Sequence, residues 1–446
     1  MRTLFLFALC VASATASAGN RLPLQPSRID DMTALRIGAR IAIDGFPDGH
    51  GNRSRIEFRR IDVYAKGARI VAVGPDGAHE LPRSPRTELV GYDASGHTRA
   101  QLGFDPGFHN VVGAGSSPSG AFSIAAENTP DGKRLVVRTA EEALPNGIMP
   151  QVIPSDDGVP SGRPMPDSLI ESLGGETVDG VLRNALVAVD VDHELLVSRF
   201  GGTGAGNLAA ATNWIADLFA TMNVMYERDL DVTLQQGTTK FRTGATPYTI
   251  SGNAAASNAD LDNFGTYWQN SEAAVPRDFA MLLSGRETSS QNPGFFASGI
   301  AWVNAYCVTQ SNGGSYSVNK VFTSASVNVE YSARIVGHEL GHNFGAAHTH
   351  CTNKTTGAYP TAANTIDVCY KGEAGSGCYG GAVSCPAGGT GTLMSYCNSS
   401  APNGASCGQN QLVFHSTQIT TVKALVAAHT PACLGTSDVI FKNGFD

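Results

Sequence analysis

The sequence predicts an α/β fold for residues 183–434, preceded by a β-rich region over residues 19–182. The later part alternates apolar runs with helical periodicity, in the order strand, helix, strands, helix. The earlier part carries short strand-like runs broken by Gly and Pro, and it contains no cysteine. Beyond residue 348 the chain is irregular, glycine-rich and dense in cysteine, so we expect disulfides to replace a core there.

Residues 1–18 have the features of a secretory signal peptide. Arg2 supplies the positive charge, residues 4–12 form a short apolar core, and residues 16–18 read A-S-A, a small-residue cleavage site. The apolar core is too short to span a bilayer, and no later segment has the length of a transmembrane helix. The sequence therefore predicts a protein that is secreted, extracellular and not held in a membrane.

The region that follows predicts strands at residues 54–63 and 68–73. From residue 146 to residue 180 the chain becomes rich in Pro, Gly, Ser and Asp, which is typical of a linker. An exposed linker between two folded units is a favourable place for proteolytic processing.

The elements after the linker begin with the apolar run Ala185–Val191, typical of a buried strand. Residues 278–283 and 299–306 predict further strands, and a helix is predicted from about Ser326 to His342. Residues 207–228 have helical periodicity, and the predicted buried face consists of Trp214, Ile215, Leu218, Phe219, Met222 and Met225.

One short segment predicts a zinc site. His338, Glu339, His342, Gly345 and His348 follow the pattern H-E-x-x-H-x-x-G-x-x-H. In a helix, His338 and His342 stand one turn apart on one face, so both imidazoles can reach the same ion. Glycine tolerates positive φ, which allows the chain to leave the helix and bring His348 back. Three protein ligands leave a fourth position for water, as in catalytic zinc sites.

The cysteines agree with export. Nine are present, and one lies inside the signal peptide. The even number of remaining cysteines in an exported chain predicts four disulfides. Their spacing includes no C-x-x-C pair, so nothing in it indicates a metal site made of thiolates. The remaining eight cysteines are Cys307, Cys351, Cys369, Cys378, Cys385, Cys397, Cys407 and Cys433.

The formal net charge is −8 and no basic run is present, so nothing indicates nucleic-acid binding.

The histidine motif and the downstream run Gly391–Cys397, which contains Met394, resemble those of metzincin zinc peptidases, and within them the reprolysin-like enzymes of secreted bacterial type. The resemblance covers residues 183–434. It implies a twisted mixed sheet, an active-site helix and an irregular disulfide-rich C-terminal subdomain. The β-rich region at residues 19–182 resembles a propeptide by its position alone. The resemblance also implies a disulfide between Cys307 and Cys433. An upper edge strand near residues 297–304 is expected to pair with extended substrates.

The resemblance assigns roles to individual residues. His338, His342 and His348 are expected to hold Zn²⁺, with Glu339 as the general base. Met394 is expected to form an apolar floor below the metal. Tyr396 either binds the zinc or stabilises the transition state, or it is a packed aromatic in a tight turn.

Together these assignments predict a secreted zinc-dependent endopeptidase made as a proenzyme. The expected partners are protein or peptide substrates, with the propeptide as inhibitor, and the expected state is a monomer. Residues 435–446 form a tail for which the sequence suggests no role beyond processing or export.

The chain departs from the reprolysin pattern in two places. Thr349 stands where those enzymes have Asp after the third histidine. Residues 19–182 lack a cysteine, which excludes latency through a cysteine that binds the zinc. His109 is a weak candidate for that role, because a lone histidine in a loop is usually solvated. His350 is a weaker candidate ligand than His348, since the glycine spacing favours the latter.

Three other functions remain open at this point. The first is an exported binding or adhesion protein that keeps a structural zinc, although such a site has no need for Glu339. The second is a narrow self-processing or toxin-activating peptidase. In the third, the N-terminal half stays attached as a substrate-binding module.

Overall fold

The computed structural model describes residues 20–130, 132–144, 147–155, 181–253, 255–286, 292–429 and 433–436. The predicted signal peptide, most of the predicted linker and residues 437–446 lie outside the described part. None of the described helices has the length and apolar content needed to cross a membrane.

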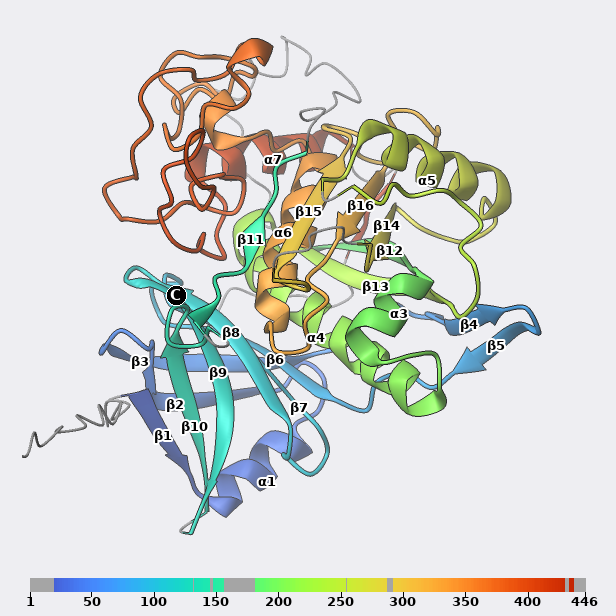
Figure 1. Ribbon diagram of the computed structural model, residues 1–446. Coiled ribbons are helices and arrows are strands. Elements are labelled where there is room, and N and C mark those ends of the chain that lie inside the picture. The colour runs from blue at the N-terminus through green and yellow to red at the C-terminus, as the bar shows by residue number, and fades with distance from the viewer. Residues whose placement is uncertain are drawn as a thin grey trace, which may run out of the picture.

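The N-terminal region is built on an eight-stranded antiparallel sheet, which confirms its β-rich character (Figure 1). The predicted strand at 54–63 is β3. Helix α1 (Pro26–Ala34) places Met32 in the core of this sheet, against aromatic side chains that include Phe46 and Phe58. The strand order is β1 (Arg21–Leu24), β10 (Gly132–Thr139), β9 (Gly120–Thr129), β8 (Val111–Ser117), β7 (Arg99–Phe104), β6 (Thr87–Tyr92), β3 (Arg53–Ile61) and β2 (Arg40–Pro47).

A second, mixed sheet carries the predicted α/β region. Its strands β16, β14, β12, β13 and β4 are parallel, while β15 runs antiparallel to β16. The strands predicted near 68–73, 185–191 and 278–283 are β4, β12 and β14. The order is β11 (Gln151–Val152), β15 (Phe296–Ala301), β16 (Tyr316–Lys320), β14 (Phe279–Ser284), β12 (Arg183–Val191), β13 (Val232–Arg242), β4 (Ile70–Gly74) and β5 (Gly77–Leu81), with β17 (Gly435–Thr436) beside β12.

The N-terminal region contributes strands at both ends of this second sheet. The β4–β5 hairpin extends the sheet beyond β13, and β11 pairs with the outer side of β15 (Figure 1). These pairings join segments more than a hundred residues apart, so local sequence patterns do not announce them. The two regions are therefore interleaved in space, and the boundary near residue 182 stays a prediction.

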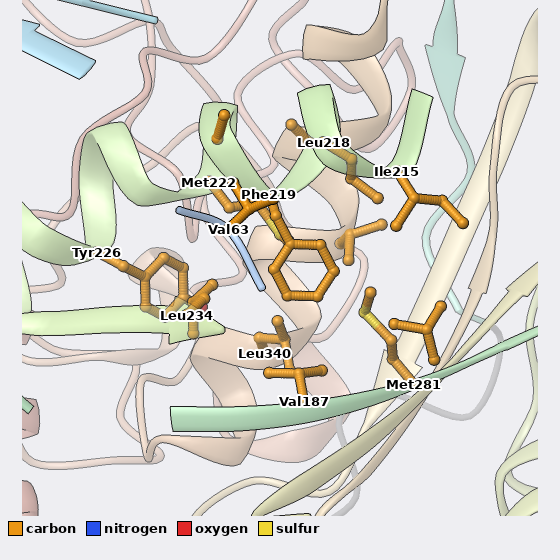
Figure 2. Packing of buried hydrophobic residues seen from close by; sticks show 14 of the residues in the cluster. Val63, Val187, Ile215, Leu218, Phe219, Met222, Tyr226, Leu234, Met281 and Leu340 are labelled. Carbon is orange, nitrogen blue, oxygen red and sulfur yellow. The ribbon is translucent and has the colours of Figure 1, made fainter. Parts of the chain in front are cut away.

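Helix α4 (Ala205–Leu230) lies between the two sheets. The face predicted to be buried is buried, and Figure 2 shows Phe219, Met222 and Tyr226 of this helix packed toward Leu340 and the strands of the mixed sheet. The opposite, more polar face is also buried, because the N-terminal sheet covers it. There Asp217 accepts a hydrogen bond from the Arg86 side chain at 2.8 Å.

The remaining helices surround the mixed sheet (Figure 1). The predicted helix over 326–342 exists, but it starts three residues later. Ser326 lies in a turn where its N–H and hydroxyl both contact Ser324, and Asn328 is the residue before the first helical turn. These helices are α3 (His193–Phe200), α5 (Asn258–Ser271), α6 (Val329–Asn343) and α7 (Ser416–His429), with short 3₁₀ turns at Thr349–Cys351 and Ala374–Ser376.

The predicted strand over 299–306 is wrong in its second half. Strand β15 ends at Ala301, because the chain then turns through Asn304, whose φ is 53°. The N–H of Asn304 donates to the carbonyl of His342 at 2.8 Å, so this turn is tied to the end of α6. A left-handed residue breaks extended pairing, and asparagine adopts that conformation more readily than most residues.

The C-terminal part is irregular and cross-linked, as expected. Four disulfides are formed, and the pairing of Cys307 with Cys433 that the resemblance implies is among them. The three that the sequence left open are Cys351–Cys378, Cys369–Cys397 and Cys385–Cys407.

Candidate metal centre

Helix α6 and the turn after it bring three histidines together. His338 and His342 occupy successive turns, and the helix ends at Asn343. Gly345 then takes a φ of 99°, and a Cβ at this position would lie 2.4 Å from Cδ1 of Leu425. Both the dihedral and the close approach require glycine. This turn directs the chain back so that His348 faces the first two histidines.

The three side chains converge on one point. Nε2 of His348 lies 3.2 Å from Nε2 of His342 and 3.2 Å from Nε2 of His338. Three nitrogens bound to one tetrahedral zinc at about 2.0–2.1 Å are separated by about 3.3 Å. All three rings are buried. The cluster therefore fits a zinc site in donor type and spacing.

The other nitrogen of each ring faces a hydrogen-bond acceptor. Nδ1 of His338 lies 2.9 Å from the carbonyl oxygen of Leu393, and Nδ1 of His342 lies 2.7 Å from that of Ala346. Nδ1 of His348 lies 2.8 Å from Oε2 of Glu373. An Nδ1–H donor leaves Nε2 free to bind metal. Burial, with His348 nearby, lowers the pKa of His338 to about 3 and keeps its ring in the neutral, metal-binding form.

Sequence reasoning missed Glu373. Its Oε2 also lies 2.6 Å from Nε2 of His350, so the carboxylate bridges two imidazoles. Burial raises the pKa of Glu373, but the His348 and His350 rings outweigh it and hold that pKa well below the usual range. The residue lies in an irregular, glycine-rich segment without periodicity, so no local signal connects it to the histidine motif.

Glu339 lies in the cleft beside the three histidines. Its side chain is buried, and burial raises its pKa well above the usual range. A Cβ at Gly299 on β15 would lie 2.3 Å from Oε1 of Glu339, so glycine is needed where the strand passes this carboxylate. His338 and Glu339 line one pocket together with Tyr396.

The turn around Met394 lies under the histidines. A Cβ added to Gly341 would lie 2.7 Å from Sδ of Met394, which places the methionine directly against α6. The N–H of Thr349 donates to the Met394 carbonyl at 3.1 Å, so the residue that departs from the reprolysin pattern still ties the third histidine to this turn. Met394 is fully buried, consistent with a floor.

Tyr396 shows features of both predicted roles. Its ring stacks on His338 with a centroid distance of 5.6 Å and an interplanar angle of 7°. The ring also lies 4.3 Å from that of His348 and lines the pocket that contains Glu339. It is therefore a packed aromatic that also borders the cleft, and its chemical role stays a prediction.

Of the two weaker histidine candidates, His109 lies away from the cluster and His350 lies beside it. The His109 side chain is exposed and contacts Asp105, and it belongs to no metal-binding group among the described residues. His350 contacts Glu373 and its ring stacks against His348.

The sequence is similar to that of a known peptidase family. A model of metallopeptidase family M12, of the reprolysin type, matches residues 182–411, which is more than half of the chain. The chain belongs to family M12. This confirms the reprolysin-like resemblance, and with it a zinc metalloendopeptidase whose substrates are proteins or peptides. No curated protein matches the sequence.

The Glu373 contact in this M12 peptidase leads to a testable expectation. Replacing Glu373 by Gln should weaken zinc binding by about 10- to 100-fold, because the His348 ring loses a charged acceptor that fixes its orientation. Competition with a chromophoric chelator measures the affinity. Glu194→Gln on α3, which changes an ion pair with Arg286, is the control and should bind zinc as the parent does. Equal affinity in Glu373→Gln would show that the contact does not orient the ligand.

Proposed function

We propose that this M12 peptidase is exported and made as a proenzyme, with His338, His342 and His348 as its zinc ligands and Glu339 as its general base. The observation that carries the proposal is the convergence of three buried imidazoles, each with an acceptor on its other nitrogen, beside a buried carboxylate in a pocket. The test is casein hydrolysis by the exported protein, with and without the Glu339 carboxylate.

The chemistry follows from this arrangement. Zinc, when bound, supplies a Lewis acid that activates water and polarises the scissile carbonyl. Glu339 takes the proton from the attacking water and then passes it to the leaving amine as the peptide bond breaks. The acceptors behind the histidines fix the direction of each ring. The Tyr396 ring stacks on the imidazole of His338.

The N-terminal region also supports a mechanism of latency. The N–H groups of Gln151 and Ile153 donate to the carbonyls of Phe295 and Ala297 at 2.8 Å each, so this segment occupies the outer side of β15. Val152 and Ile153 line the pocket that contains Glu339. We propose that this segment blocks the site by lying where an extended substrate pairs. Such latency needs no cysteine, in agreement with the composition of residues 19–182.

Replacing Ile153 by Pro should increase the activity of the unprocessed protein, because proline removes the N–H that donates to Ala297. The expected gain is several-fold, measured as the initial rate on a quenched peptide before any cleavage of the chain. Val152→Pro is the matched control. Parallel pairing uses the N–H groups of alternate residues, so the N–H of Val152 points away from β15. Equal latency in parent and Ile153→Pro would contradict blockage by this segment.

Two of the open alternatives receive less support. A structural zinc protein has no use for a buried carboxylate at the wall of the pocket. A permanent substrate-binding module is hard to reconcile with a segment that fills the cleft. A narrow self-processing peptidase stays compatible with the site, and a diverse peptide library separates it from a general enzyme.

A further inference from the structure

The pocket beside Glu339 contains one arginine. Arg334 lies one helical turn before His338 on α6, so both side chains emerge on the same face of the helix. The pocket is otherwise lined by apolar groups such as Ile335 and Leu393 and by polar groups such as Asn410. The guanidinium therefore lies in the same pocket as Glu339.

The hydrogen-bonding capacity of Arg334 is largely unused. The side chain is 7% exposed, and its Nε donates to the carbonyl of Asn410 at 2.7 Å. Nη1 and Nη2 are buried and have no hydrogen-bond partner in the described part of the chain. Buried polar groups are nearly always paired, and an unpaired charged donor is costly. Two buried donors of Arg334 are therefore available to a group that enters the pocket.

Glu330 balances the charge of Arg334 without occupying these donors. Its Oε1 lies 3.9 Å from Nη1, which is too long for a hydrogen bond. In the unprocessed chain that oxygen instead accepts from the Ser123 hydroxyl of β9 at 2.7 Å. Burial raises the pKa of Glu330 to about 6, against the opposing effects of Arg334 and Ser123. The planar fork of N–H groups on Arg334 stays available for a second carboxylate.

The position of Glu339 identifies which substrate residue meets this arginine. This step rests on the proposed function of Glu339 as the group that protonates the leaving amine. The residue that contributes this amine is P1′, the first residue after the scissile bond, and it must pass over Glu339. Its side chain therefore enters the pocket that Glu339 and Arg334 share.

We propose that Arg334 binds the carboxylate of an Asp or Glu side chain at P1′, so that this peptidase cuts preferentially before acidic residues. Arginine pairs with carboxylates through two parallel hydrogen bonds, which are stronger than bonds between neutral groups. In the unprocessed chain, Val152 and Ile153 line the same pocket, so the acidic side chain binds only after this segment leaves.

The test compares substrates that differ at one position. The full-length chain is exported, allowed to mature and loaded with zinc. It is then assayed on N-acetylated, C-amidated peptides with Asp, Glu, Asn, Gln or Leu at P1′. We expect kcat/KM for Asp and Glu to exceed that for Asn and Gln by about 10- to 100-fold, the usual size of a hydrogen bond to a charged group. Equal values in the parent protein would overturn the proposal.

Variants assign the preference to Arg334. In Arg334→Leu the ratio of acid to amide should fall toward one, and Arg334→Lys should keep part of it, because lysine retains the charge but not the fork. Glu330→Gln is the matched control on the same helix face and should keep the ratio or raise it. An unchanged ratio in Arg334→Lys and Arg334→Leu would overturn the assignment. If Arg334→Leu fails to fold, the parent and the lysine variant still decide.

A second set of peptides separates two sources of carboxylate. These peptides end at P1′ with a free C-terminus and a neutral side chain. A preference for them over the amidated, acidic peptides would show that Arg334 binds the chain terminus, and the side-chain proposal would fail. If the parent cuts no peptide of either set, the proposed peptidase function itself fails, which is a different result from cleavage without acidic preference.

Discussion

Replacing Glu339 by Gln is expected to lower the rate of peptide hydrolysis by about 10² to 10⁴-fold, because glutamine cannot accept and return the proton that the reaction moves. The amide has nearly the same shape as the carboxylate, and it fits beside Gly299 on β15 as the carboxylate does. The three histidines are untouched, so zinc content should equal that of the parent. Initial rates on a quenched peptide and zinc content by atomic absorption give the two quantities.

The control for this variant is a second substitution of the same type elsewhere. Glu194→Gln, on α3 in the region after residue 182, changes a partly exposed ion pair with Arg286 and should keep the parental rate. A Glu339→Gln protein with full zinc content and near-parental kcat would exclude Glu339 as the base. A variant without zinc would instead indicate disturbance of the ligands.

Replacing His348 by Ala should weaken zinc binding by at least about 10²-fold and remove activity at ordinary zinc concentrations. Four-ligand zinc sites contribute about 10–16 kcal/mol of binding, so losing one of three protein ligands costs several kcal/mol. Chelator competition measures the affinity. The three-ligand arrangement depends on the convergence of the Nε2 atoms. Nε2 of His348 lies 3.2 Å from Nε2 of His342 and 3.2 Å from Nε2 of His338.

His350→Gln is the matched control, because His350 lies two residues away, its Nε2 contacts Glu373, and its ring only stacks on that of His348. Glutamine keeps an N–H donor for that carboxylate. We expect zinc affinity within about 10-fold of the parent, the lower end of the effects seen for groups behind the ligands. The reverse result, with zinc lost in His350→Gln and kept in His348→Ala, would exchange the roles of the two histidines.

The elements that the sequence predicted are those whose conformation is determined by residues close together in the chain. The histidine spacing and Gly345 specify a helix, its end and the return of the chain within eleven residues, and the structure follows them. The buried face of α4 follows the same logic, since helical periodicity places Ile215 and Phe219 on one side. The error at 299–306 is also local in origin, because the left-handed turn at Asn304 lies within an otherwise strand-like run.

The parts that sequence did not predict depend on contacts between distant segments. The run at 68–73 was expected as a strand, yet nothing in it indicates pairing with β13 of the later domain. The pairing of β11 with β15 depends on two residues from a region that reads as linker. Glu373 reaches His348 across an irregular loop closed by the disulfide between Cys351 and Cys378. Long-range pairing of this kind has no periodic signature.

As an M12 peptidase, this chain is expected to hydrolyse proteins by chemistry that depends on zinc and Glu339. The most direct test is casein hydrolysis by the exported, mature protein beside its Glu339→Gln variant, with zinc content measured in both. We expect cleavage by the parent and almost none by the zinc-loaded variant. A fully zinc-loaded parent that cuts neither casein nor a diverse peptide library would contradict this expectation.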